Sequence, residues 1–141
     1  MTTQVARLYD DLITLTWYFS DRCCTGSHVE CLSMVDFLTL RLIHKYHHCP
    51  IQTISKALGM TKSGATRVVK RLEKQGLISI CTSSEDARVR CLSLTETGSK
   101  AVDNVIQTQT RHLQTLLTSM GDENSHQLSS GIEALMTTLK S

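Results

Sequence analysis

The sequence predicts a mainly α-helical fold with one small β-hairpin. Proline occurs once among 141 residues, so long helices are permitted nearly throughout the chain. Apolar residues recur at helical spacing over most of its length. Two short, partly alternating runs at residues 77–81 and 89–94 are instead typical of paired strands.

Helices with long apolar faces are predicted towards both ends of the chain. In residues 4–20 the apolar side chains follow steps of three and four, at Val5, Leu8, Leu12, Leu15 and Phe19. A long helix is expected from Thr95 to about Met120, and a last helix follows Gly121. These apolar faces are too extended for one small core, so the pattern also predicts dimerisation.

Three further helices and the hairpin are predicted in the middle of the chain. Ser33 can cap a helix over residues 33–46, because a carboxylate follows three positions later. Residues 51–58 form a short helix, and Thr61 or Ser63 can cap the next one, which runs to about residue 75. The two strands that follow are joined by a polar tip.

Positive charge is concentrated between residues 62 and 90. This segment holds seven basic and three acidic residues, for a net charge of +4, while the whole chain has +2. A phosphate-binding surface requires such a concentration, although a solvated helix face would show it too.

Two short helices joined by a tight turn and followed by a hairpin describe a winged helix-turn-helix. The helix after residue 61 has an apolar stripe on one side, and Arg67 and Lys70 lie on the opposite side. A helix with such a face fits the major groove of B-DNA. Arg88 and Arg90 place positive charge on the hairpin, which can reach the minor groove or the DNA backbone.

Several motifs in their joint spacing resemble the MarR family of transcriptional regulators. The stretches that carry the resemblance are LSMVDF at 32–37, ISKALGM at 54–60, ATRVVKRLEKQGLI at 65–78, DAR at 86–88 and LTETG at 94–98. The resemblance implies a sequence-specific DNA-binding transcriptional regulator, in particular a repressor. It would act as a homodimer on a pseudo-palindromic operator in double-stranded DNA.

The resemblance also implies a domain layout and a set of DNA contacts. Residues 1–141 would form a single domain, with a winged helix-turn-helix core at 30–100 and dimerisation helices at 1–22 and 101–141. Within the wing, Asp86 would orient the arginine that enters the minor groove, while Ala87 departs from the more usual basic residue. The predicted DNA-binding residues are Lys62, Ser63, Thr66, Arg67, Lys70, Asp86, Arg88 and Arg90.

The sequence does not predict an enzyme. It contains no nucleophile elbow, phosphate-cradling glycine loop or metalloprotease pair. A thiol redox or metal-binding protein without a gene-regulatory role is the alternative class, but there is no Cys-x-x-Cys motif. Without an apolar run long enough to span a bilayer or a secretory signal, the expected location is the cytoplasm.

Three of the six cysteines, Cys23, Cys24 and Cys31, fall within nine residues and form a candidate sensor. These thiols could bind a soft metal or an iron–sulfur cluster, although their spacing matches no standard pattern. One thiol could instead be oxidised and resolved by another. The remaining alternatives are a small organic acid in the dimer crevice as the effector, or thiols that only pack.

The weaker metal candidates are His28, His44, His48 and Cys49. A competing interpretation of the histidines near residue 48 is that polar or cationic groups suit the C-terminus of a helix. Cys81 and Cys91, on the two predicted strands, are expected to be packing residues.

Overall fold

The computed structural model describes residues 3–21 and 32–141 and confirms the mainly helical fold with a small sheet. The chain forms two compact units, Met1–Val105 and Ile106–Ser141. The single domain expected over residues 1–141 stays a prediction. The elements in order are α1 (Thr3–Asp21), α2 (Met34–Lys45), β1 (Cys49–Pro50), α3 (Ile51–Ala57), α4 (Lys62–Lys74), β2 (Ile78–Thr82), β3 (Arg90–Leu94), α5 (Glu96–Met120) and α6 (Asp122–Lys140).

The sheet has three antiparallel strands in the order β1-β3-β2. Strands β2 and β3 are the predicted hairpin; β2 is shifted by one residue from the expected bounds, and β3 begins one residue later and ends as expected. The sequence did not predict β1, in which Cys49 pairs with Leu92 and Pro50 with Cys91. Two residues are too few to show an alternating pattern, so only pairing with β3 reveals this strand.

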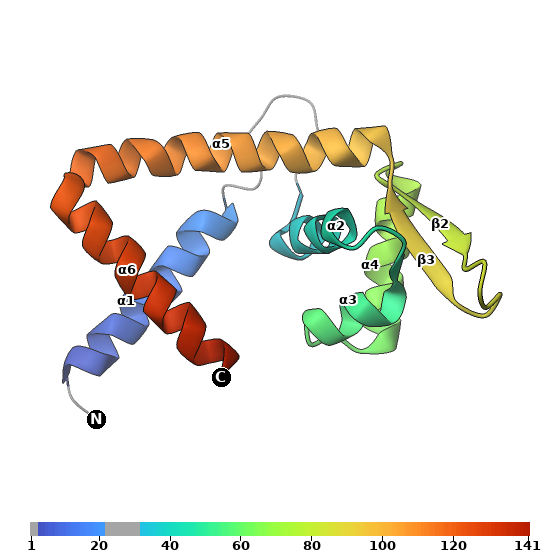
Figure 1. Cartoon of the computed structure of the whole chain (residues 1–141), viewed down its shortest axis with the longest axis horizontal. Helices are drawn as coiled ribbons and strands as arrows, with labels where there is room; N and C mark the ends of the chain where they lie inside the picture. Colours follow the sequence, from blue (N-terminus) through green and yellow to red (C-terminus); the bar gives the residue numbers. More distant parts are fainter. Residues whose placement is uncertain (1–2, 22–31) are drawn as a thin grey trace. The chain divides into compact units, whose positions relative to one another are not determined.

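The core of the first unit is formed by α2, α3, α4, the first turns of α5 and the sheet. Figure 1 shows the order of these elements along the chain. Each of these elements turns its apolar side chains to that shared interior. Its largest fully buried apolar side chains are Leu40, Ile43, Ile54, Val69, Leu72, Leu92 and Val102. This packing holds α4 with its opposite face outward, which leaves the polar face in contact with solvent.

Helix caps that the sequence predicts fix where α2 and α4 begin. Ser33 and Asp36 form a reciprocal capping box at the start of α2, as expected. Of the two candidate caps for α4, Thr61 has the role, and its Oγ1 accepts a hydrogen bond from the Gly64 amide at 3.0 Å. Gly59 supplies the turn before it with a φ of 61°, a conformation that glycine adopts without strain.

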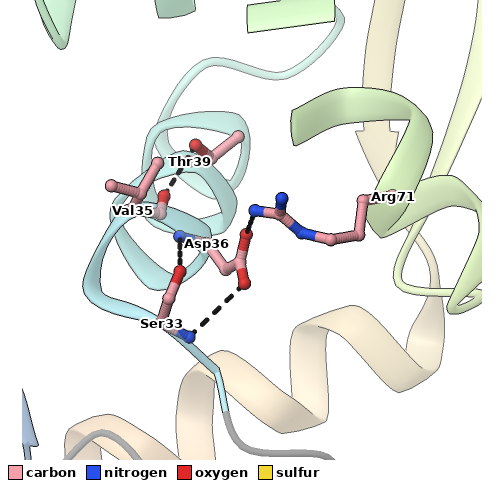
Figure 2. A network of polar contacts seen from close by, with 5 residues as sticks. All are labelled: Ser33, Val35, Asp36, Thr39 and Arg71. Carbon is pink, nitrogen blue, oxygen red and sulfur yellow. Dashed lines mark hydrogen bonds and ion pairs between the residues drawn. The ribbon is translucent and has the colours of Figure 1, made fainter. Parts of the chain in front are cut away.

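An ion pair joins the start of α2 to α4 (Figure 2). The Arg71 guanidinium donates to Asp36 Oδ1, while the backbone amide of Ser33 donates to Asp36 Oδ2 at 3.4 Å. Asp36 is buried, so its carboxylate has exchanged water for these donors. The contact ties α4 to α2, although the two residues are 35 positions apart in the chain.

The helices outside this core keep exposed apolar faces. On α1, Val5, Leu8, Leu12 and Leu15 are exposed, and α6 has no buried residue. The exposed apolar residues of α6 are Leu128, Ile132, Leu135, Met136 and Leu139. No helix among residues 3–21 and 32–141 is long and apolar enough to cross a membrane.

Candidate nucleic-acid interface

The predicted groove-facing residues all lie on α4, around its solvent side. Lys62, Ser63, Arg67 and Lys70 are exposed, and Thr66 is half-buried. The Thr66 hydroxyl donates to the Lys62 carbonyl oxygen at 2.9 Å, so it lies against its own helix. The opposite stripe of α4 is buried in the core. The helix therefore presents a row of polar and basic groups at the surface while its apolar side anchors it.

The wing is folded by its own backbone and by Asp86. The Ser83 amide donates to the Val89 carbonyl at 2.8 Å, and the Val89 amide donates to the Asp86 carbonyl at 3.0 Å. Asp86 Oδ1 accepts from the backbone amide of Arg88 at 2.9 Å. The acid thus holds the main chain of the arginine and leaves the guanidinium exposed at the tip.

Helix α4 and the wing meet in a concave surface of the first unit. An open cavity of about 310 Å³ is lined by Lys62 and Thr66 of α4 and by Arg88 and Arg90 of the wing, together with Ile51, Gln52 and Ser55 of α3. Three basic side chains from two elements therefore converge on one hollow. This is the electrostatic arrangement that a phosphate backbone requires.

Sequence reasoning missed the contribution of α3 to this surface. Gln52 and Ser55 line the same cavity as the arginines, although neither was among the predicted DNA contacts. They lie three residues apart on one side of α3, but this spacing alone gives no sign that packing brings them beside the wing.

The candidate sensor residues Cys23, Cys24 and Cys31, and His28 with them, lie outside the described residues. The other metal candidates are described. His44 and His48 are exposed beside a cavity of about 420 Å³, whereas Cys49 is fully buried. Over residues 3–21 and 32–141, no group of three or more His, Cys, Asp and Glu side chains could hold a metal ion.

Two expected packing residues differ from each other in exposure. Cys91, on the central strand β3, is buried as predicted, but Cys81, on the outer strand β2, is exposed. Burial raises the pKa of the Cys49 thiol, the hydrogen bond with Thr53 opposes that effect, and nearby Cys91 adds to it. Cys49 is therefore a packed thiol that the core shields from solvent.

These features together define the winged helix-turn-helix class of DNA-binding proteins. The sequence profile of the MarR family matches residues 32–89 of this chain. That range begins at α2 and ends in the wing, so it contains the whole concave surface described above except Arg90.

Similar proteins agree with this match. The chain is 29% identical to the organic hydroperoxide resistance transcriptional regulator of Bacillus subtilis over 103 residues, 73% of this chain and 69% of that protein. It is 30% identical to the transcriptional repressor MprA of Escherichia coli over 105 residues, 73% of this chain and 60% of that protein. The matched stretches span 49% to 69% of the curated relatives' own lengths.

A solved structure with a similar fold is that of FabT from Streptococcus pneumoniae, in complex with DNA. It superposes with a TM-score of 0.82 at 20% identity and covers 97% of this chain and 96% of FabT. Residues 32–89 of this chain thus match the MarR family, as the motifs indicated. The curated relatives are transcriptional regulators, in agreement with the predicted class, and they give no support to the alternative of a thiol redox or metal-binding protein.

Proposed function

We propose that this protein is a sequence-specific DNA-binding transcriptional repressor that acts as a homodimer on a pseudo-palindromic operator. The observation that carries the proposal is the convergence of Lys62, Arg88 and Arg90 on one concave surface beside the exposed face of α4. In this proposal α4 enters the major groove and reads base edges, while the wing tip reaches the minor groove. Because the operator is part of chromosomal DNA, we propose the cytoplasm as the place of action.

The side chains of this surface have different roles in this proposal. Ser63, Thr66, Arg67 and Lys70 face the bases and the flanking phosphates, and Lys62 binds phosphate at the entrance of the groove. Arg88 inserts into the minor groove, and the hydrogen bond from its amide to Asp86 limits the conformations of the tip. Arg90 adds a phosphate contact that Ala87 cannot make.

Dimer formation is supported by the exposed apolar side chains of α1 and α6. Water-exposed rows of Leu and Ile on long helices are unfavourable unless a partner covers them. A second copy of the chain offers the same faces, which suits a two-fold symmetric interface and a DNA site with inverted half-sites. Sedimentation velocity at several protein concentrations tests this step, and a monomer throughout the micromolar range would contradict it.

The DNA-binding step is tested by selecting duplexes from a random library and measuring their affinity by fluorescence anisotropy. We expect inverted half-sites about one helical turn apart, and an affinity that falls steeply with salt. Arg88→Ala should lower the affinity roughly 5- to 100-fold and reduce the salt slope by about one. Arg41→Ala, which removes the same charge from the exposed surface of α2, is the matched control and should leave both unchanged.

Two results would refute the proposal. One is recovery of no preferred sequence from the library while the protein remains folded by circular dichroism. The other is an equal loss of affinity in the Arg88→Ala and Arg41→Ala variants, since a general charge effect would then explain the loss without a wing contact.

Regulation by an effector is a further part of the proposal, with Cys23, Cys24 and Cys31 as the candidate sensor and a small organic acid as the alternative signal. Anaerobic purification followed by absorption spectroscopy and native mass spectrometry would detect a bound metal or iron–sulfur cluster. Operator binding that ignores soft metals and oxidants, in a colourless protein, would contradict the thiol sensor.

A further inference from the structure

Cys81 and Cys91 lie directly opposite each other on β2 and β3 of the wing. Opposed residues of an antiparallel pair point to the same face of the sheet, with Cα atoms about 4.5 to 5.5 Å apart. That separation falls inside the range of roughly 4.4–6.8 Å that disulfides span. The backbone register therefore already brings the two cysteines to bridging distance.

The side chains also lie against each other's strand. Cys81 Sγ donates to the backbone oxygen of Cys91 at 3.5 Å, so the Cys81 side chain is turned towards the opposite strand. Both thiols are free in this structure. Rotation of the two side chains about their χ1 bonds, with little change in the backbone, is the movement needed for the sulfur atoms to meet.

Access to this pair differs between its two members. Both cysteines line a cavity of about 570 Å³ on the wing, together with His48 and the residues of the hairpin tip. Cys81 is exposed, whereas Cys91 is 8% exposed. A small oxidant can thus reach Cys81 first, and the less accessible Cys91 thiol can then react with the oxidised Cys81.

The third described cysteine near the pair is not a competing partner. Cys49 pairs with Leu92 rather than with Cys91, which puts it on the core face of the sheet. It is fully buried, and burial raises the pKa of its thiol, so little nucleophilic thiolate forms there.

We propose that Cys81 and Cys91 are a modification site at which a peroxide forms a reversible disulfide across the wing. The Cys81 thiolate attacks one peroxide oxygen, the O–O bond breaks, and a sulfenic acid and water or an alcohol result. The Cys91 thiol then attacks the sulfenic sulfur, the S–S bond forms and water leaves. The two thiols together lose two electrons and the peroxide gains them. A dithiol reductant breaks the disulfide again by thiol–disulfide exchange.

The bond would close the nine-residue loop from Thr82 to Arg90, which holds Arg88 and Arg90. It would therefore restrict the part of the molecule that we propose to contact DNA. The existence of the disulfide is independent of that proposed function. A test by peptide mapping can consequently fail or succeed without any DNA-binding measurement.

The experiment treats the fully reduced full-length protein with a slight excess of hydrogen peroxide, blocks remaining thiols and digests with trypsin. Cleavage after Lys74, Arg88, Arg90 and Lys100 separates the peptide 75–88, which contains Cys81, from the peptide 91–100, which contains Cys91. We expect most of the Cys81 peptide to be joined to the Cys91 peptide, two hydrogens lighter than their sum. Dithiothreitol should release both.

The variants that accompany the map are Cys49→Ser, as the matched control, and Cys91→Ser. Cys49→Ser should retain the linked peptide, and Cys91→Ser should leave Cys81 as a sulfenic acid that dimedone traps. Wild-type protein in which Cys81 stays a free thiol, or is joined to a cysteine other than Cys91, would overturn the proposal. Because that result needs no substitution, a variant that fails to fold does not prevent the test.

Discussion

Substituting Arg71 with alanine removes the guanidinium that pairs with Asp36 and leaves a carboxylate enclosed by the protein. The side chain of Asp36 is 8% exposed and that of Arg71 is 49% exposed. Removing one partner of a fully buried pair costs about 3–5 kcal/mol, whereas an exposed pair contributes about 0–1 kcal/mol. With one partner buried and the other half in water, we expect a loss of about 1–3 kcal/mol in the free energy of unfolding.

The measurement is urea denaturation followed by circular dichroism, at one fixed protein concentration because the proposed dimer would make stability depend on concentration. For a slope of about 1–3 kcal/mol per molar urea, the midpoint should fall by roughly 1 M. The control is Lys100→Ala, which breaks the ion pair with Glu96, where the side chains are 72% and 84% exposed. That change should shift stability by less than about 0.5 kcal/mol.

A double-mutant cycle with Asp36→Ala decides whether the pair itself is responsible. The double variant should lose less free energy of unfolding than the two single variants added together, by at least about 1 kcal/mol, since each change removes the same contact. Strict additivity, or an Arg71→Ala variant as stable as Lys100→Ala, would refute this reasoning and show that α4 is held by its apolar stripe alone.

Three further predictions concern backbone approach, capping and thiol reactivity. Gly98→Ala should destabilise the fold by several kcal/mol, since a Cβ there would lie 1.9 Å from the Leu77 carbonyl oxygen; thermal unfolding measures the loss. Thr61→Ala removes the cap of α4 and should cost about 1 kcal/mol, measured by urea denaturation. Iodoacetamide at mildly alkaline pH should label Cys81 well before Cys49, because Cys81 is exposed while burial raises the pKa of the Cys49 thiol; mass spectrometry measures the order.

Each of these has a result that contradicts it. Gly131→Ala meets no atom within 4 Å and should be neutral or stabilising, so equal losses at Gly98 and Gly131 would contradict the steric argument. A Thr61→Ala variant as stable as the wild type would show that another group caps the helix. Equal labelling of the two thiols would indicate that the core around Cys49 opens readily.

The order and type of the helices and of the hairpin were determined by the sequence alone. Helix starts are local events, so Ser33 with its carboxylate three residues later was sufficient to predict the start of α2. The same holds for the start of α4, where the sequence left open only whether Thr61 or Ser63 is the capping residue. The exposed basic face of α4 followed from the helical spacing of its apolar residues, because a helix that buries its apolar stripe presents its polar side to solvent.

Contacts between distant segments were decided only by the tertiary structure. Strand β1 exists because β3 offers Cys49 and Pro50 a pairing edge, which no property of those two residues indicates. The partner of Asp36 is another residue that local patterns cannot name, since a charged side chain gives no sign of which opposite charge packing will bring to it. Gln52 and Ser55 joined the basic surface for the same reason. Local sequence determines which hydrogen bonds a short segment can satisfy by itself, and packing of the core determines which segments then lie together.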